Sequence, residues 1–158
     1  MKSKYALLFS VLAIASATNA SAITRVFNIT GATAFRAAAN STIITMLGGA
    51  GTTLYAYTGT SGIGGSNRAI FQGTMPAQFP GDTIIVRASW SGSTQGILDL
   101  ADGNAIQFLD DNGNTLTTGG QRLGEAGDPV PVYETAVARW SFSDVDKLLS
   151  TRPNATLS

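Results

Sequence analysis

Residues 29–35, Ile-Thr-Gly-Ala-Thr-Ala-Phe, constrain the fold most, because an expected strand ends there and an expected helix follows at once. Residues 23–30 alternate apolar and polar side chains, which predicts a strand with one face inward. Residues 34–47 carry apolar side chains near helical spacing, and Gly48 follows where a helix C-terminal cap is expected. The first N–H groups of such a helix lack partners within it, so the turn predicts a place where an anion can bind.

Two later segments repeat this order of strand, polar turn and helix. Residues 83–89 form a β-branched run that predicts a buried parallel strand, and residues 95–101 predict a short helix after it. Residues 136–142 alternate again and predict a strand, after which residues 145–149 predict the start of a helix. Strands that alternate with helices predict a parallel sheet, so we expect the three strand ends to meet at one edge.

Hairpin insertions are expected between these units. Residues 52–58 and 68–75 predict two short strands, joined by a glycine-rich loop at residues 59–67 that lacks the Lys-Ser/Thr ending of a phosphate-binding P-loop. Residues 105–109 predict another strand. The turn at residues 110–114 predicts a hairpin rather than a calcium loop, because the expected glycine and glutamate of a calcium loop are missing.

The remaining segment, residues 116–133, is rich in Gly, Thr, Asp and Pro and shows no periodicity, which predicts a surface excursion. The alanine-rich face of the first helix predicts close packing against a sheet. Together these patterns predict an α/β fold with a mostly parallel sheet, flanking helices and β-hairpin insertions.

The first 22 residues predict a secretory signal peptide. Lys2 and Lys4 give a positive start, residues 5–15 are apolar, and Ala-Ser-Ala at residues 20–22 is a small-residue cleavage pattern. A membrane anchor is the alternative, but the apolar run is about half of the roughly 20 residues that span a bilayer. We therefore expect a periplasmic or secreted protein in which residues 23–158 form one domain.

Composition excludes several function classes. The chain has no cysteine and no histidine, which removes the usual residues of zinc sites, haem sites and Ser-His or Cys-His nucleophiles. Without Lys2 and Lys4, the 10 basic side chains become 8 against 10 acidic ones, a net charge of −2 that offers no basic surface to nucleic acid. We expect a binding protein without catalytic residues, metal or cofactor rather than an enzyme.

The three strand ends carry small hydroxyl residues, backbone donors at helix N-termini and one carboxylate. Short donors of this kind suit a small tetrahedral oxyanion, because each helix N-terminus contributes roughly half a positive charge. Capping is the alternative role for several of these residues, Thr33, Ser143 and Asp144 among them. The predicted ligand-binding residues are Thr33, Ala34, Phe35, Ser91, Ser93, Ser143 and Asp144.

Asp144 favours a protonated oxyanion. A carboxylate repels an anion unless a proton lies between them, and hydrogen phosphate can donate one to Asp144. Sulfate at neutral pH carries no proton, so the same carboxylate would reject it. The sequence therefore predicts phosphate or a similar oxyanion as the ligand.

Three motifs, Gly-Ala-Thr-Ala-Phe at residues 31–35, Ser-Gly-Ser-Thr-Gln-Gly-Ile at residues 91–97 and Phe-Ser-Asp at residues 142–144, resemble the phosphate-binding proteins of ABC transporters. Those are type II periplasmic binding proteins. The resemblance implies that a threonine hydroxyl and a following backbone N–H bind phosphate, which carries over to Thr33 and to Ala34 or Phe35. It also implies a membrane-bound ABC transporter complex as partner.

The second and third motifs carry further implied roles. The binding serine of the family carries over to Ser91, with Ser93 as the alternative, and the aspartate that accepts the phosphate proton carries over to Asp144. Long insertions precede residue 83 and follow residue 110. The family's second lobe supplies an arginine and a Ser-Gly-Thr turn that have no counterpart here, so we expect part of a first lobe, with weak or no binding by this piece alone.

Two other functions remain open on the sequence. A secreted structural or adhesive protein is suggested by the Gly/Thr/Ser loops and the low charge, and it predicts exposed edge strands and no response to anions. A phosphatase-like enzyme is the third, although no pair of nucleophile and base stands out.

Overall fold

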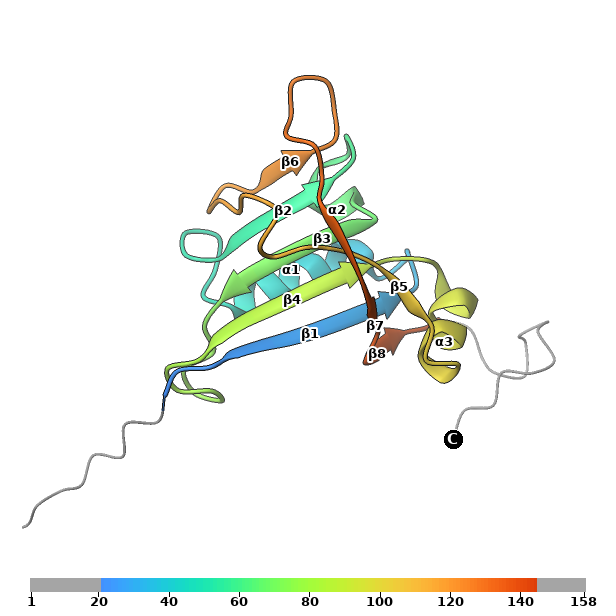
Figure 1. Cartoon of the computed structure of the whole chain (residues 1–158), viewed down its shortest axis with the longest axis horizontal. Coiled ribbons are helices and arrows are strands. Elements are labelled where there is room, and N and C mark those ends of the chain that lie inside the picture. The colour runs from blue at the N-terminus through green and yellow to red at the C-terminus, as the bar shows by residue number, and fades with distance from the viewer. Residues whose placement is uncertain (1–20, 145–158) are drawn as a thin grey trace, which may run out of the picture.

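The computed structural model describes residues 21–144, which form one large sheet, a small sheet and three helices (Figure 1). Most of the expected leader and the helix expected at residues 145–149 lie outside the described residues. The helices are α1 Arg36–Met46, α2 Gly62–Gly65 and α3 Ser93–Ala101. The strands are β1 Thr24–Gly31, β2 Leu54–Thr58, β3 Arg68–Gly73, β4 Thr83–Ser89, β5 Ala105–Leu109, β6 Gln121–Leu123, β7 Tyr133–Val137 and β8 Trp140–Phe142.

The large sheet has the strand order β6-β2-β3-β4-β1-β8. The pairs β1–β4, β1–β8 and β2–β6 are parallel, and the pairs β2–β3 and β3–β4 are antiparallel. The α/β class and the β2–β3 hairpin insertion are therefore confirmed, in a sheet that is mixed rather than parallel throughout. Strand β4, expected to be a parallel strand, is parallel to β1 on one side and antiparallel to β3 on the other.

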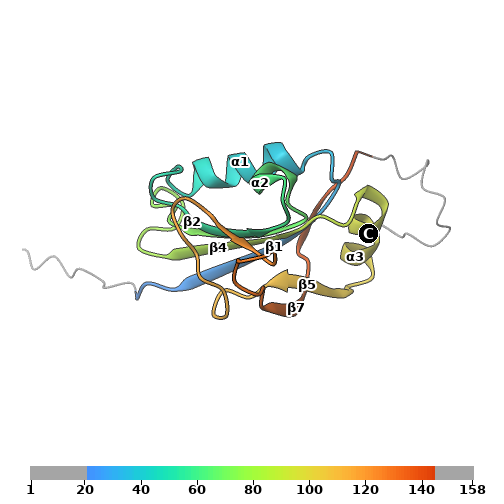
Figure 2. The same ribbon diagram turned by 90° about the horizontal axis from the view of Figure 1, so that it is seen from above.

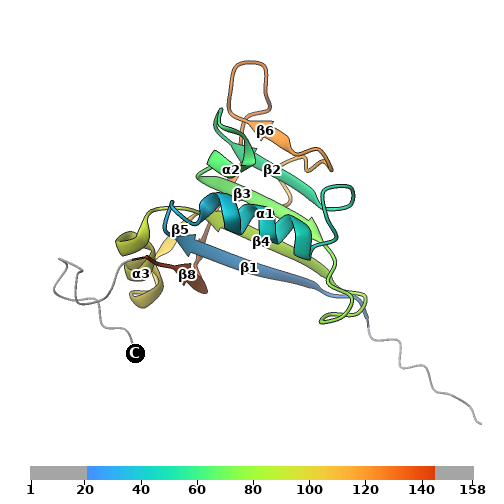
Figure 3. The ribbon, with the colours of Figure 1, turned by 180° about the vertical axis from the view of Figure 1, so that it is seen from behind.

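Helix α1 and the short α2 cover one face of this sheet (Figures 2 and 3). Ile44 and Leu47 from α1 and its C-cap pack in one buried cluster with Phe71 and Ile84 from the sheet. A buried Asn40 on α1 accepts a hydrogen bond from the Trp90 indole N–H at 3.2 Å. Helix α1 thus packs on the sheet through Ile44 and Leu47. The close packing expected of its alanine-rich face is wrong, because Ala37 and Ala38 are exposed and Ala38 and Ala39 line an apolar hollow.

The opposite face is covered by the antiparallel pair β5–β7 (Figure 2). Side chains alternate along β4, so Ile84 joins the cluster beneath α1 and Ile85 joins a second cluster with Leu109 and Leu123. Arg87 also faces this side, and its buried guanidinium pairs with carboxylates of the connecting segment and β7. The two faces are therefore closed by different means, a helix on one and a small sheet on the other.

Three expectations about the later part of the chain are wrong. The strand expected at residues 136–142 is two strands in different sheets, because the chain leaves β7 at Val137 and joins β1 as β8 only at Trp140. The turn at residues 110–114 closes no hairpin, since β5 pairs with β7 instead of the next strand. Residues 116–133 are not wholly a surface excursion, because β6 extends the sheet edge and its Leu123 is buried.

Smaller differences concern helix boundaries. Helix α1 begins at Arg36, two residues later than expected, and α3 begins at Ser93, two residues earlier. The glycine-rich loop contains the four-residue α2. Within the described part of the chain, no helix has the length and apolar character needed to cross a membrane.

Candidate functional site

Three parallel strands, β4, β1 and β8, end at the same edge of the large sheet (Figure 1). The register places Thr30 between Ser89 on β4 and Ser141 on β8. The chain leaves β1 toward α1 on one face, and it leaves β4 through α3 toward β5 on the other (Figure 2). Neighbouring strands whose connections part in this way form the crevice where open α/β sheets bind ligands.

Glycines let the three strand ends approach one another closely. Ala32 N–H donates to the Phe142 carbonyl at 2.7 Å, and Gly92 N–H donates to the Gly31 carbonyl at 2.9 Å. A Cβ on Gly31 would collide with the backbone of Phe142, and a Cβ on Gly96 would lie 2.5 Å from the Gly31 Cα. The first turn of α3 therefore rests directly on the end of β1.

A chain of polar contacts runs from β1 into α3. The buried Thr30 hydroxyl donates to the Ser89 carbonyl at 2.7 Å and lies 3.1 Å from the Ser91 hydroxyl. Ser91 donates in turn to Asp99 at 3.4 Å, and the Gln95 amide donates to the other Asp99 oxygen at 2.7 Å. Asp99 is a buried carboxylate with hydrogen-bond donors on both oxygens.

The segment after β8 meets the start of α3. The Ser93 hydroxyl donates to Asp144 Oδ1, so the predicted serine and the predicted carboxylate are in contact. Asp144 is exposed and Ser143 is half-buried. The first main-chain bond of α3 runs from the Gly96 N–H to the Gly92 carbonyl at 2.8 Å, which leaves the N–H groups of residues 93–95 without partners inside the helix.

The turn before α1 is a poorer donor than the sequence predicts. Thr33, Ala34 and Phe35 are all exposed, but the Phe35 N–H donates to the Ala32 carbonyl at 3.1 Å. The Arg36 N–H likewise donates to the Thr33 carbonyl at 3.3 Å. Because the helix starts at Arg36, these two donors close the turn. The predicted anion contact at this turn is left to the Thr33 hydroxyl and the Ala34 N–H.

Three residues of this region were missed by sequence reasoning as candidates. Thr30 belonged to the expected strand, Asp99 to the expected helix, and Ser141 to the expected last strand. The Ser141 hydroxyl is buried beside Gly96 and has no hydrogen-bond partner within residues 21–144. The alternation of residues 136–142 could have indicated which face Ser141 takes, but not that α3 covers it.

One arginine borders the same edge. Arg36, the first residue of α1, donates through Nη1 to the Asn67 side chain, and the Asn67 carbonyl accepts the Trp90 N–H at 2.8 Å. The guanidinium is thereby linked to the residue that precedes Ser91. The edge therefore combines hydroxyls, helix donors and one nearby cation with the carboxylates of Asp99 and Asp144.

An apolar hollow lies on the α1 face of the sheet. It has a volume of about 500 Å³ and is lined almost wholly by apolar side chains, including Phe35 from the turn and Phe142 from β8. None of Thr33, Ser91, Ser93, Ser143 or Asp144 lines it. The predicted site residue Phe35 does line it, so the apolar hollow adjoins the polar strand ends at the turn before α1 and at β8.

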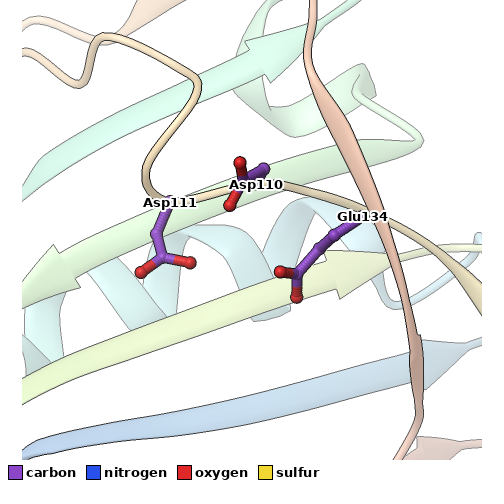
Figure 4. A group of neighbouring side chains, drawn as sticks. All are labelled: Asp110, Asp111 and Glu134. Carbon is purple, nitrogen blue, oxygen red and sulfur yellow. The ribbon is translucent and has the colours of Figure 1, made fainter.

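Three carboxylates gather on the other face, where Asp110, Asp111 and Glu134 lie close together (Figure 4). Their nearest oxygens lie within 4.8 Å of one another, the spacing of a metal site. Arg87, however, pairs with both Asp111 and Glu134. A guanidinium thus already pairs with two of the three carboxylates, and the contacts fasten β7 and the end of β5 to β4.

These strand ends, rather than the hollow or the acidic group, match the site that the sequence predicts. The chain matches no protein-family model, no curated protein and no solved structure.

Proposed function

We propose that this chain is the oxyanion-binding part of an exported solute-binding protein, with hydrogen phosphate as ligand. One observation carries the proposal: the carboxyl ends of three parallel strands place the Ser93–Asp144 contact beside the N-terminus of α3. Helix N-termini favour anions through unpaired N–H groups and the helix dipole. This is a binding function that needs no catalytic residue, metal or cofactor.

Ser91 and Ser93 supply the side-chain donors in this proposal. Ser91 follows the end of β4 and is exposed, while Ser93 is the first residue of α3. Both hydroxyls rotate freely enough to turn from their present acceptors to a bound oxyanion. Thr33 and the Ala34 N–H follow the end of β1, where the Ala32 N–H donates to the carbonyl of Phe142, the residue before Ser143.

Asp144 gives the site its preference. Its contact with Ser93 places a carboxylate at the start of the helix that attracts the anion. Phosphate can place a proton between itself and Asp144, whereas sulfate cannot at neutral pH. We therefore propose that Asp144 accepts the phosphate proton and excludes sulfate.

The same proposal includes the protein family and the membrane partner. The chain would be the first part of the first lobe of a type II periplasmic binding protein, delivering phosphate to an ABC transporter complex in the membrane. In such a protein a second lobe closes on the ligand, excludes water and strengthens the polar contacts. Affinity of the chain alone is then expected to be weak.

Thermal unfolding with phosphate or sulfate tests this function. A ligand at a hundredfold excess over its Kd stabilises the folded state by about 2.7 kcal/mol, so millimolar to tens of millimolar phosphate should raise the unfolding midpoint. Sulfate at equal ionic strength should not. Asp144→Asn should abolish this discrimination, and Asp102→Asn, an equal charge change at the exposed C-cap of α3, should preserve it. No response of the unchanged protein to phosphate would overturn phosphate binding by this chain on its own.

A secreted structural or adhesive protein is the second candidate, and the edge of the large sheet favours it. Strand β8 is an edge strand on which Trp140 and Phe142 are 47% and 44% exposed. Both side chains also line the apolar hollow. If Trp140→Ser reduces binding of the protein to an apolar surface while phosphate has no effect, this second function replaces the first.

A further inference from the structure

At the amino end of β1, the buried carboxylate of Asp82, the residue before β4, lies against the backbone nitrogen of Ile23. Asp82 Oδ1 accepts the Ile23 N–H at 3.1 Å, and Asp82 Oδ2 accepts the Arg25 Nε–H at 2.6 Å. Asp82 is 7% exposed, whereas its partner Arg25 has a side chain that is 41% exposed. One carboxylate therefore serves a backbone donor and a guanidinium at the first residues of the sheet.

Further contacts fix the position of Ile23. Its carbonyl accepts the Thr83 N–H at 3.0 Å, which extends the β1–β4 pairing by one rung beyond Thr24. Arg25 is held from the other side, with its guanidinium 4.8 Å from the centre of the Phe79 ring. Ile23 is itself exposed and lies just before β1, but Ser21 and Ala22 have no hydrogen bond to any of residues 21–144. The fixed structure therefore begins between Ala22 and Ile23.

This boundary coincides with the end of the Ala-Ser-Ala pattern at residues 20–22. We propose that a leader peptidase that selects small residues cuts between Ala22 and Ile23, and that the new α-ammonium of Ile23 forms an ion pair with Asp82. The cut breaks the peptide C–N bond with water as the only other reactant, and it leaves a carboxylate on Ala22 and an ammonium on Ile23. This inference rests on the expected leader and is independent of the proposed phosphate site.

The charge arrangement suits a cut at this bond. Before cleavage, the Ile23 nitrogen offers one neutral N–H to Asp82. After cleavage, the same atom carries a positive charge and three donors, and charge-assisted hydrogen bonds are roughly twice as strong as neutral ones. A cut one residue earlier or later would move the ammonium away from Asp82. Processing would thus fasten the first strand of the mature protein.

The position of the cut is tested on the full chain. Expressed with its own leader in a Gram-negative bacterium, the exported protein is purified and its intact mass and N-terminal sequence are determined. Ile23 is expected as the first residue. An uncut chain, or another first residue, would overturn the proposal.

The ion pair is tested with a chain that carries one additional residue before Ile23. A leaderless version made in the cytoplasm keeps an initiating methionine before Ile23, so its ammonium lies one residue away from Asp82. We expect this version to unfold at a lower temperature than the exported protein. After Asp82→Asn in both, the difference between them should largely vanish. An equal difference in the two backgrounds would contradict the ion pair, because the extra methionine would then act without Asp82.

Discussion

At the amino ends of β1 and β4, the Asp82 carboxylate is matched by Arg25 and by the Ile23 N–H. At the carboxyl ends of the same two strands, hydroxyl groups and two carboxylates gather, and no ion pair within residues 21–144 involves Asp99 or Asp144. The first end is balanced in charge. The second has donors that can turn to a ligand.

The difference separates a role in stability from a role in binding. Both Asp82 oxygens have partners within the protein itself, so the Asp82 end serves to fasten the strands. Exposed hydroxyls at a helix N-terminus cost little to redirect, so the Ser93 end is suited to bind. Substitutions at the two ends should therefore affect different measurements.

The largest effect is expected at the carboxyl end from Gly31→Ala, because close approach of backbones builds that end. Gly31 has φ of 132°, and a Cβ there would meet the Phe142 backbone. Strained backbone and overpacking each cost about 2 kcal/mol, so we expect a loss of about 4 kcal/mol in the free energy of unfolding. Denaturant titration measures it.

Gly51→Ala is the matched control, since a Cβ at Gly51 meets nothing within 4 Å and its φ is not positive. It should change the free energy of unfolding by less than about 0.5 kcal/mol. Similar losses for Gly31→Ala and Gly51→Ala would show that the strand ends are not closely packed. The proposed difference between the two ends of β1 and β4 would then be wrong.

The next largest effect is expected at the amino end, where Asp82 makes stability depend on pH. The Ile23 N–H and then Arg25 hold the pKa of Asp82 below its usual 3.8. A folded-state pKa below the unfolded value means that ionised Asp82 stabilises the fold above about pH 4, and that this stabilisation is lost as pH falls through the lower value. Asp82→Asn should therefore lower the free energy of unfolding at neutral pH, by less than Gly31→Ala does. It should also reduce the further loss of stability in acid, below about pH 4.

The exposed Asp102 gives the control for this titration. Asp102→Asn should leave the loss of stability in acid unchanged. If Asp82→Asn and the unchanged protein lose stability in parallel between about pH 4 and pH 2, Asp82 is not what fastens the amino end.

The elements that sequence reasoning predicted well are those with strong local signals. Strand β4 has the bounds predicted from its β-branched run, and α1 follows β1 as predicted. The division of residues 136–142 into β7 and β8 has no local signal, because no Gly or Pro marks the point where the chain leaves β7 and the Arg139 N–H bonds to the Asn28 carbonyl of β1. Strand β6 is similar: three residues form a strand only because β2 lies beside them.

The candidate site shows the same limit. The rule that parallel strands share their carboxyl edge was enough to bring together the segments containing Ser91, Ser93 and Asp144. It could not identify Asp99 or Ser141, whose positions depend on how Gly96 lets α3 pack onto β1 and β8. Whether the site binds phosphate stays a prediction.

A smaller effect is expected from Thr30→Val, which keeps the side-chain shape and removes the hydroxyl. The Ser89 carbonyl and the Ser91 hydroxyl each lose a partner. We expect a loss of about 1 kcal/mol by denaturant titration. Thr24→Val, at the exposed start of the same strand, should cost less than about 0.5 kcal/mol. Equal costs would indicate that the Thr30 contacts do not organise the carboxyl end.

The smallest effect on stability, and the sharpest test of the comparison, is expected from Ser93→Ala. Within residues 21–144 the hydroxyl bonds to the exposed Asp144 alone, so stability should change by less than about 0.5 kcal/mol. Phosphate affinity, measured by calorimetric titration, should fall about fivefold, which corresponds to one hydrogen bond of about 1 kcal/mol. Ser41→Ala, on the exposed face of α1, should change neither quantity. If Ser93→Ala instead lowers stability and leaves the affinity for phosphate unchanged, Ser93 caps the structure as Asp82 does, and the two ends of the strand pair share one role.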